Sequence, residues 1–327
     1  MQQGQQDIPQ TAVSLSASVK FSGLTSMRFL AALAVIAHHT VGFKPGYGGV
    51  SLFFVLSGFV LAHSYAHRVE TAAQRVFFWK GRIKRIWPAH IVTMAFAIPL
   101  GVPTLGVLIA NALLLQGWTP DSAVYFSLNA VSWSLCAEAF FYFCFPFIAR
   151  IKTALVIAIL CAVTAGALYA TLQGFDPKLS HALFYINPVF RIPEFMAGIV
   201  LARITLREVK DRYLLIAWVL TFAIVWVYPE QPLTLALAFL PASALTIIGL
   251  AHRSAGWAVS PMLVRLGEAS FLLYMVAQLC QRYAIGLLGE GLTANLVSIP
   301  IALAISYAVH FREEIISRYR LSMAQKT

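Results

Sequence analysis

The chain has 327 residues, of which 59% are hydrophobic and 11% are charged, and its mean hydropathy is +0.76. Soluble domains carry roughly 25% charged residues, so the composition excludes an ordinary soluble protein and predicts an all-α polytopic membrane bundle. The formal net charge is +11, and the placement of the basic residues, described below, accounts for it without a nucleic-acid partner.

The first twenty residues are polar and rich in Gln and Ser, which is typical of a disordered tail and not of a cleavable signal peptide. The four cysteines, Cys136, Cys144, Cys161 and Cys280, lie in apolar runs and have no metal-binding or redox spacing. We interpret them as small buried residues and expect no metal site.

Ten apolar runs are candidates to cross about 30 Å of hydrocarbon, which requires roughly 17–25 helical residues. They cover 24–43, 49–65, 86–117, 131–149, 153–172, 188–205, 212–228, 232–251, 266–288 and 292–311. The third run is too long for one plain helix and contains Pro99, Gly101 and Pro103. We therefore expect a break there, followed by a short tilted or re-entrant segment over 104–117.

The basic residues predict the orientation. With ten crossings and both termini in the cytoplasm, 19 of the 24 Lys and Arg residues lie on the cytoplasmic side, six of them in a loop over 66–85. Counting 86–117 as two crossings would move every later loop to the opposite side of the membrane. We expect a disordered tail over 1–20, a membrane domain over 21–312 and a basic cytoplasmic tail over 313–327.

The first apolar run contains Arg28 and His39, separated by ten residues of which nine are apolar. Eleven residues make about three helical turns, so the two side chains should share a face, with about 16 Å between their backbones. His39 is a natural general base, because free imidazole titrates near neutral pH. The alternative is a structural histidine satisfied by a neighbouring helix. His38 points about 100° away from His39, which favours a structural or orienting role.

Arg82, Lys84 and Arg85 precede the third apolar run. Basic residues in this position are typical of topology signals and of contacts with lipid headgroups. The alternative is an anion clamp for a phosphorylated cytosolic ligand.

Two further sites place charge inside apolar runs. Glu138 lies about two turns into the fourth run, where a carboxylate needs a partner or a proton, and we expect it to orient His39. Arg191 and Glu194 are three residues apart and so share a helical face. Their simplest interpretation is an internal ion pair that fixes helix packing.

Six segments together resemble the integral-membrane acyltransferase-3 family. They are Arg28-x10-His39, FFVLSGF at 53–59, RIKRIWP at 82–88, SWSLCAEAFFY at 132–142, RIPEFMAGI at 191–199 and GEASFLLYM at 267–275. They occur in the family's order and cover nearly the whole chain. The resemblance implies ten membrane helices and an O-acyltransferase, usually one that uses acetyl-CoA to modify a glycan or another hydroxylated acceptor.

The family's arginine–histidine pair falls on Arg28 and His39, and its RxxR element falls on Arg82 and Arg85. Trp133 lies in the fourth segment and is a candidate substrate-site or structural residue. The family often has a histidine shortly after the late tyrosine, where this chain has Gln278. Some relatives carry an extra extracytoplasmic hydrolase-like domain, and we expect none here.

The expected mechanism joins these observations. Arg82, Arg85 and Lys84 would hold the phosphates of cytosolic acetyl-CoA, and its pantetheine arm would pass Arg28 to bring the thioester near His39. His39, oriented by Glu138, would deprotonate an acceptor hydroxyl. A covalent acyl intermediate on Ser57 or His39 is an alternative to direct transfer, although the pair Ser57-Gly58 also suits close helix packing.

Intramembrane Arg, His and Glu also mark proton relays and substrate pathways. A proton-coupled transporter or flippase of an anionic solute is therefore the alternative function. Matching interrupted helices in two halves, which transporters often have, are not evident in the sequence. We expect the bacterial inner membrane as the location. The acceptor remains open between polysaccharide, lipid-linked sugar, small antibiotic and peptidoglycan.

Overall fold

The computed structural model describes residues 21–174, 176–204, 209–227, 232–312 and 314–316. The predicted tail over 1–20 lies outside this part of the chain, as does nearly all of the predicted tail over 313–327. The described residues form helices and short turns, with no strand among them, which confirms the all-α prediction.

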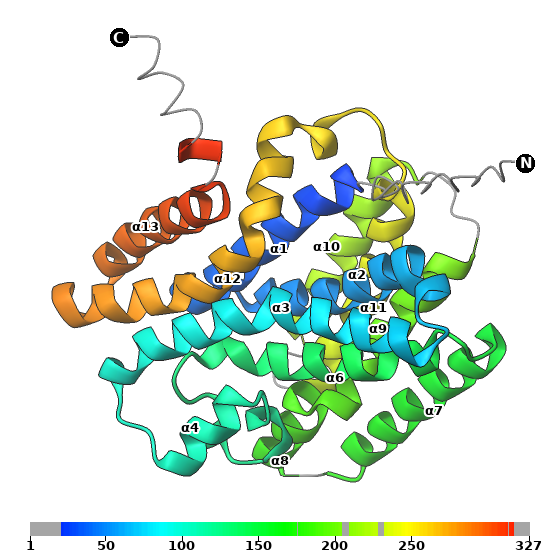
Figure 1. Ribbon diagram of the computed structural model, residues 1–327, viewed down its shortest axis with the longest axis horizontal. Helices are drawn as coiled ribbons and strands as arrows, with labels where there is room; N and C mark the ends of the chain where they lie inside the picture. Colours follow the sequence, from blue (N-terminus) through cyan, green and yellow to red (C-terminus); the bar gives the residue numbers. More distant parts are fainter. Residues whose placement is uncertain (1–20, 175, 205–208, 228–231, 313, 317–327) are drawn as a thin grey trace, which may run out of the picture.

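The helices, in chain order, form one bundle (Figure 1). Their bounds are α1 Ser22–Val41, α2 Gly48–Tyr65, α3 Ala72–Ala97, α4 Leu105–Ala112, α5 Ser122–Tyr125, α6 Trp133–Ile148, α7 Thr153–Leu172, α8 Pro177–His181, α9 Pro188–Arg203, α10 Asp211–Val227, α11 Pro232–Leu250, α12 Pro261–Leu288 and α13 Leu292–His310. Each of the ten predicted apolar runs overlaps one of the longer helices. Among the described residues, five helical segments are long and apolar enough to cross a membrane: Ser22–Val41, Lys44–Arg68, Ala130–Ile148, Pro261–Leu288 and Leu292–His310.

Helix α3 differs from the prediction at its start. It begins at Ala72, inside the segment 66–85 that we expected to be a loop. The cause is a capping box: Gln74 N donates to Thr71 Oγ1 at 3.2 Å, and Thr71 N donates to Gln74 Oε1 at 3.0 Å. The basic residues from Arg75 to Arg85 therefore lie on a helix, in fixed rotational positions.

The expected break after α3 is confirmed. The α-helix ends at Ala97, a single 3₁₀ turn follows over Ile98–Leu100, and the short helix α4 begins at Leu105 with Thr104 as its cap. Proline removes a backbone donor and clashes with the preceding turn, so Pro99 and Pro103 end the helix where the sequence predicts.

Close backbone contacts hold the centre of the bundle together. A Cβ atom on Gly58 of α2 would meet the carbonyl oxygen of Phe195, and one on Gly198 of α9 would meet that of Val55. Gly267 of α12 meets the backbone of Thr25 on α1 in the same way. Small residues at membrane-helix crossings allow this approach, and they fix α1, α2, α9 and α12 relative to one another.

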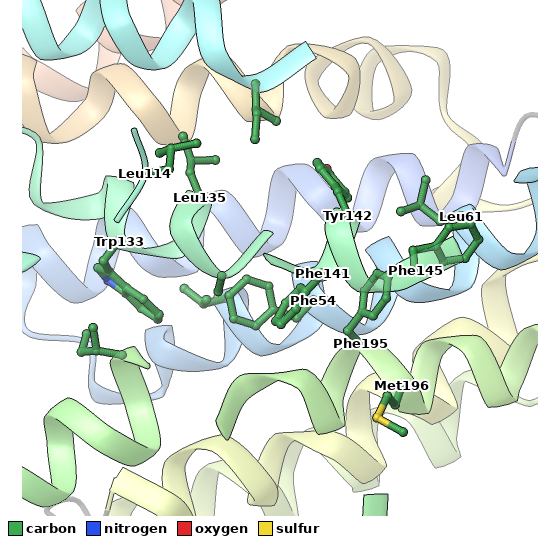
Figure 2. Packing of buried hydrophobic residues seen from close by; sticks show 14 of the residues in the cluster. Phe54, Leu61, Leu114, Trp133, Leu135, Phe141, Tyr142, Phe145, Phe195 and Met196 are labelled. Carbon is green, nitrogen blue, oxygen red and sulfur yellow. The ribbon is translucent and has the colours of Figure 1, made fainter. Parts of the chain in front are cut away.

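Aromatic side chains anchor α6 against this centre (Figure 2). The Phe141 ring stacks on Phe195 of α9 at a centroid distance of 5.0 Å and meets Phe54 of α2 edge-on, also at 5.0 Å. Such pairs contribute about 0.5–1.5 kcal/mol each beyond the burial of their area. The neighbouring face of α6, with Glu138 and Tyr142, lines a cavity together with residues of α1 and α3.

The glycine contact between α2 and α9 yields a test. Gly198→Ala should destabilise the protein by about 1–3 kcal/mol, because the added methyl group overlaps the Val55 backbone. Thermal unfolding of the detergent-purified protein measures this. Gly166→Ala in α7 is the matched control, since no atom lies within 4 Å of a Cβ there. Equal melting temperatures for the two variants would contradict the proposed crossing.

Candidate functional site

A polar cavity of about 180 Å³ lies between α1, α2, α3, α6 and α12. Its wall contains three arginines, two glutamates and four hydroxyl groups: Arg28, Arg82, Arg85, Glu138, Glu268, Ser22, Thr25, Ser57 and Tyr142. We call it the arginine cavity. The guanidinium groups of Arg28 on α1 and of Arg82 and Arg85 on α3 make the cavity suitable for binding an anionic ligand.

Two of its arginines keep unused donors. The Nε atoms of Arg28 and Arg82 are buried and have no hydrogen-bond partner among the described residues. Arg82 Nη2 donates to the Tyr65 hydroxyl at 3.1 Å, and the guanidinium lies 5.0 Å from the centre of that ring. The tyrosine therefore orients Arg82 but leaves Nε available. A buried unpaired donor is costly, and an oxyanion in the cavity would remove that cost.

Lys84 lies apart from this group. Arg82 and Arg85 are one turn apart on α3 and both line the cavity, whereas Lys84 is exposed and does not line it. The sequence prediction that Lys84 joins the clamp is therefore not supported by its position, because a residue two places after Arg82 points away from the shared face.

A second cavity, of about 220 Å³, opens beside the other end of α1. Its wall is rich in rings: His38, His39, Tyr47, Phe126, Trp133, His181, Tyr185 and Tyr274. We call it the histidine cavity. His38 packs on Tyr47 at a ring distance of 4.0 Å, and its Nδ1 donates to the Phe43 carbonyl at 3.3 Å. Its ring orientation is thus fixed by the protein.

His39 is exposed and is the less constrained imidazole of the pair. Its ring centre lies 5.0 Å from that of His38, and its backbone carbonyl accepts a hydrogen bond from Gln281 Nε2 at 3.1 Å. Gln278 lines a small space next to His39 and accepts a hydrogen bond from Val131 N at 3.2 Å. Gln278, which stands where relatives often have a histidine, is therefore beside the candidate base.

His181 supplies a third imidazole. It is the last residue of the one-turn helix α8, and the centre of its ring lies 5.2 Å from that of Tyr185. Burial, together with the positive charge of Arg191, lowers the pKa of His181 below its ordinary value. A neutral imidazole at this wall can accept a hydrogen bond. The sequence analysis did not select His181, because nothing near it in the chain marks it.

A narrow space of about 40 Å³ lies between the two cavities. It shares Arg28 and Glu138 with the arginine cavity, and it shares Tyr274 with the histidine cavity. The Tyr274 hydroxyl donates to the Val131 carbonyl at 3.1 Å and lies 2.9 Å from Ser134 Oγ. Arg28 and His39 therefore face neighbouring cavities along one helix, as their spacing predicts.

Glu138 does not take the place expected from the sequence. It lines the arginine cavity and the narrow space, whereas His39 lines the histidine cavity. Its neighbours are Arg28, Arg82 and Arg85, together with Tyr142. The position of Glu138 therefore favours a role in balancing the arginines, since direct orientation of His39 would require contact between the two side chains.

Arg191 and Glu194 form the predicted ion pair, with Nε–Oε2 at 2.8 Å. The two residues are 0% and 1% exposed. Arg191 Nη2 also donates to Ser51 Oγ at 3.3 Å, and its guanidinium lies against the rings of Phe54, Trp133 and Tyr185 at 5.1, 5.8 and 4.7 Å. Trp133 and Tyr185 also line the histidine cavity, so this buried arginine supports one of its walls.

No group of three His, Cys, Asp or Glu side chains suited to a metal ion occurs in the described part of the chain. The chemistry available to the site is that of guanidinium, imidazole, carboxylate and hydroxyl groups.

These features define an integral membrane protein with a cationic cavity and a histidine-lined cavity side by side. The family described as "Acyltransferase domain" matches residues 21–311, and the chain belongs to this family. It is 32% identical to "Acyltransferase MdmB" of Streptomyces mycarofaciens over 83% of this chain and 81% of that protein. It is 34% identical to "Protein 2 in picA locus" of Rhizobium radiobacter over 28% of this chain and 55% of that protein. No solved structure matches the chain. The family identifies the chain as an acyltransferase, which favours the enzyme over the transporter alternative.

The buried ion pair yields a second test. Glu194→Ala should destabilise the protein by about 3–5 kcal/mol, because it leaves the Arg191 charge buried and uncompensated. The double variant Arg191→Met/Glu194→Met removes both charges and should unfold at a higher temperature than Glu194→Ala. Thermal unfolding in detergent compares them. A double variant less stable than the single one would show that Arg191 stabilises the fold through its ring contacts rather than through the pair.

Proposed function

We propose that the protein is a membrane O-acyltransferase that moves an acyl group, in the first instance acetyl, from acyl-CoA to a hydroxyl of a carbohydrate or another hydroxylated acceptor. The observation that carries this proposal is the pair of cavities on one helix. One is lined by arginines with unused donors, the other by imidazoles, and only a narrow space separates them.

The arginine cavity suits the donor. Acyl-CoA carries phosphate groups, and guanidinium groups recognise phosphate oxygens through paired charge-assisted hydrogen bonds. Arg82 and Arg85 would bind these phosphates at the mouth of the cavity. Arg28, deeper and next to the narrow space, would bind the pantetheine arm, which would pass that space to bring the thioester near His39. Glu138 and Glu268 reduce the net positive charge of the empty cavity.

The histidine cavity suits the acceptor and the base. His39 would take the proton of the acceptor hydroxyl as its oxygen attacks the thioester carbonyl, and the resulting imidazolium would return that proton to the departing CoA thiolate. One C–O bond forms, one C–S bond breaks, and no net proton is consumed. His38, with its ring fixed by Tyr47 and Phe43, is placed to orient His39 or the acceptor.

A covalent route is the alternative to direct transfer. Ser57 lines the arginine cavity, so an acyl group on Ser57 would lie on the donor side and would still have to pass the narrow space. Gly58, its neighbour, provides the close contact with α9. The position of the pair therefore favours direct transfer, with Ser57 as part of the donor wall.

Ten crossings with both termini in the cytoplasm, in a bacterial inner membrane, complete the proposal. The segment 118–130 then lies outside, and the arginine cavity opens to the cytosol, where acyl-CoA is made. A cysteine placed at Ser122 in a cysteine-free background should react with a membrane-impermeant maleimide added to intact cells. Reaction only in inverted vesicles would contradict this orientation.

The donor clamp is tested by binding. Arg82→Ala/Arg85→Ala should weaken the binding of CoA to the purified protein at least about tenfold, because each charge-assisted hydrogen bond contributes roughly 1.5–3 kcal/mol. Isothermal titration calorimetry measures this. Lys84→Ala is the matched control: it removes a neighbouring positive charge that does not line the cavity. Equal weakening in the control would mean that the segment acts only through its general charge.

His39 is tested by transfer. His39→Ala and His39→Gln should lower acyl transfer by about 10²–10⁴-fold, the usual contribution of general-base catalysis, while CoA binding is retained. His38→Ala should have a smaller effect. Release of free CoA thiol from acetyl-CoA in membranes, and mass spectrometry of envelope glycans from a deletion strain complemented with each variant, provide the two measurements.

Near wild-type transfer in the His39 variants would overturn the assignment of the base. Normal CoA affinity in the same variants shows that the fold and the donor site are intact. The glycan analysis also identifies the acceptor, because the acetylated species missing from the deletion strain returns with the wild-type chain.

A further inference from the structure

A hollow larger than either the arginine cavity or the histidine cavity lies outside both of them. It is a groove of about 770 Å³ between α3, α12 and α13, and we call it the apolar groove. Its wall is almost entirely hydrocarbon, and Val92, Phe96, Leu272, Val276, Leu279 and Ile301 are representative. α3 and α13 both pack against α12, which makes α12 the floor of the groove (Figure 1).

The groove is long and narrow. On α12 its lining runs from Leu272 to Leu288, which is about 24 Å at a rise of 1.5 Å per residue. A flexible hydrocarbon chain, which needs only apolar contacts along its length, suits a groove with such a wall.

The two ends of the groove differ. Near one end the Tyr283 hydroxyl donates to the Phe96 carbonyl at 2.7 Å, which joins α3 to α12. At the other end the lining includes Arg312, which follows the end of α13. That end is also the basic end of α12 and α13, where Arg265 pairs with Glu314 at 2.8 Å. The groove therefore has an apolar end near Phe96 and an end whose lining includes the cationic side chain of Arg312.

We infer that the apolar groove is a binding site for an anionic phospholipid, with one acyl tail lying along α12 and the phosphate at Arg312. The hydrocarbon wall takes the tail, and the cation at the end takes the headgroup, which is the arrangement by which basic residues at membrane surfaces bind anionic lipids. The site is independent of the proposed transfer reaction, since the apolar groove shares no lining residue with the arginine cavity or the histidine cavity.

The experiment uses the full chain in phosphatidylcholine vesicles that contain a minor fraction of phosphatidylglycerol with a photoreactive diazirine near the end of one tail. After illumination, mass spectrometry maps the labelled residues. We expect labels to concentrate on the groove-facing residues of α3, α12 and α13. Labels spread evenly over the lipid-exposed helices would overturn the inference.

Two variants and one control variant test the tail site and the headgroup site separately. Val92→Trp fills the groove and should abolish the concentrated labelling. Val219→Trp on α10 is the matched control, because Val219 is a valine with the same 55% exposure that does not line the groove. Arg312→Ala should reduce labelling by phosphatidylglycerol about fivefold, the effect expected for one basic residue near the surface. It should leave labelling by a phosphatidylcholine probe with the same tail unchanged.

Each outcome decides a part of the inference. Unchanged labelling in Val92→Trp would exclude a tail in the groove. Equal labelling by the two probes in the wild-type protein would exclude selection for an anionic headgroup. Cross-links between two copies of the chain at groove residues, in place of lipid labels, would show that the groove is a dimer interface. The folding of each variant is checked by its elution from size-exclusion chromatography in detergent.

Discussion

The fully buried pair of Arg191 and Glu194 is the constraint on which the centre of the bundle depends. Arg191 lies on α9, donates to Ser51 of α2 and stands against Trp133 of α6 and Tyr185. Taking a guanidinium out of water is expensive, and the charge is tolerated only where its partners are all in place. The pair therefore demands one relative position of α2, α6 and α9, which is the position that the glycine crossing of Gly58 and Gly198 also imposes. Packing and electrostatics specify the same arrangement, and the histidine cavity takes its shape from it.

Helix α1 carries the two reactive ends of the proposed site. An α-helix is rigid and has a fixed rise per residue, so the separation of Arg28 and His39 is set by the number of residues between them. Gly267 of α12 and Gly49 of α2 pack closely on this helix, which leaves little freedom for it to slide. In the proposed mechanism this rigid helix would hold a long donor in extended form and present its thioester at a fixed depth. Rigid placement of this kind reduces the entropy cost of bringing two substrates together.

Much of this arrangement could be predicted from local periodicity. The shared face of Arg28 and His39, the ion pair of Arg191 and Glu194, the break near Pro99 and the positions of the long helices all follow from spacing and composition. The start of α3 at Ala72 could also have been predicted from the sequence, because Thr71 and Gln74 have the spacing of a capping box. Glu138 was placed wrongly because hydropathy does not give the depth or rotation of one helix against another. Tyr47, the pair of His181 and Tyr185, and Tyr274 come from three separate segments, and only tertiary packing brings them to one wall.

The narrow space at Tyr274 has a consequence for the membrane itself. Cavities that enter a bundle from opposite faces would together form a conducting pore if they met in an open channel. Here the space between the two cavities has a volume of about 40 Å³, which is room for only a few waters. It lies next to the ring of Phe53 and the fixed hydroxyl of Tyr274. A hydrated ion cannot cross such a neck without losing most of its shell, which is very costly in a low-dielectric surrounding. In the proposed mechanism only the thin pantetheine arm passes this neck, which would keep the bilayer electrically sealed while acyl transfer takes place.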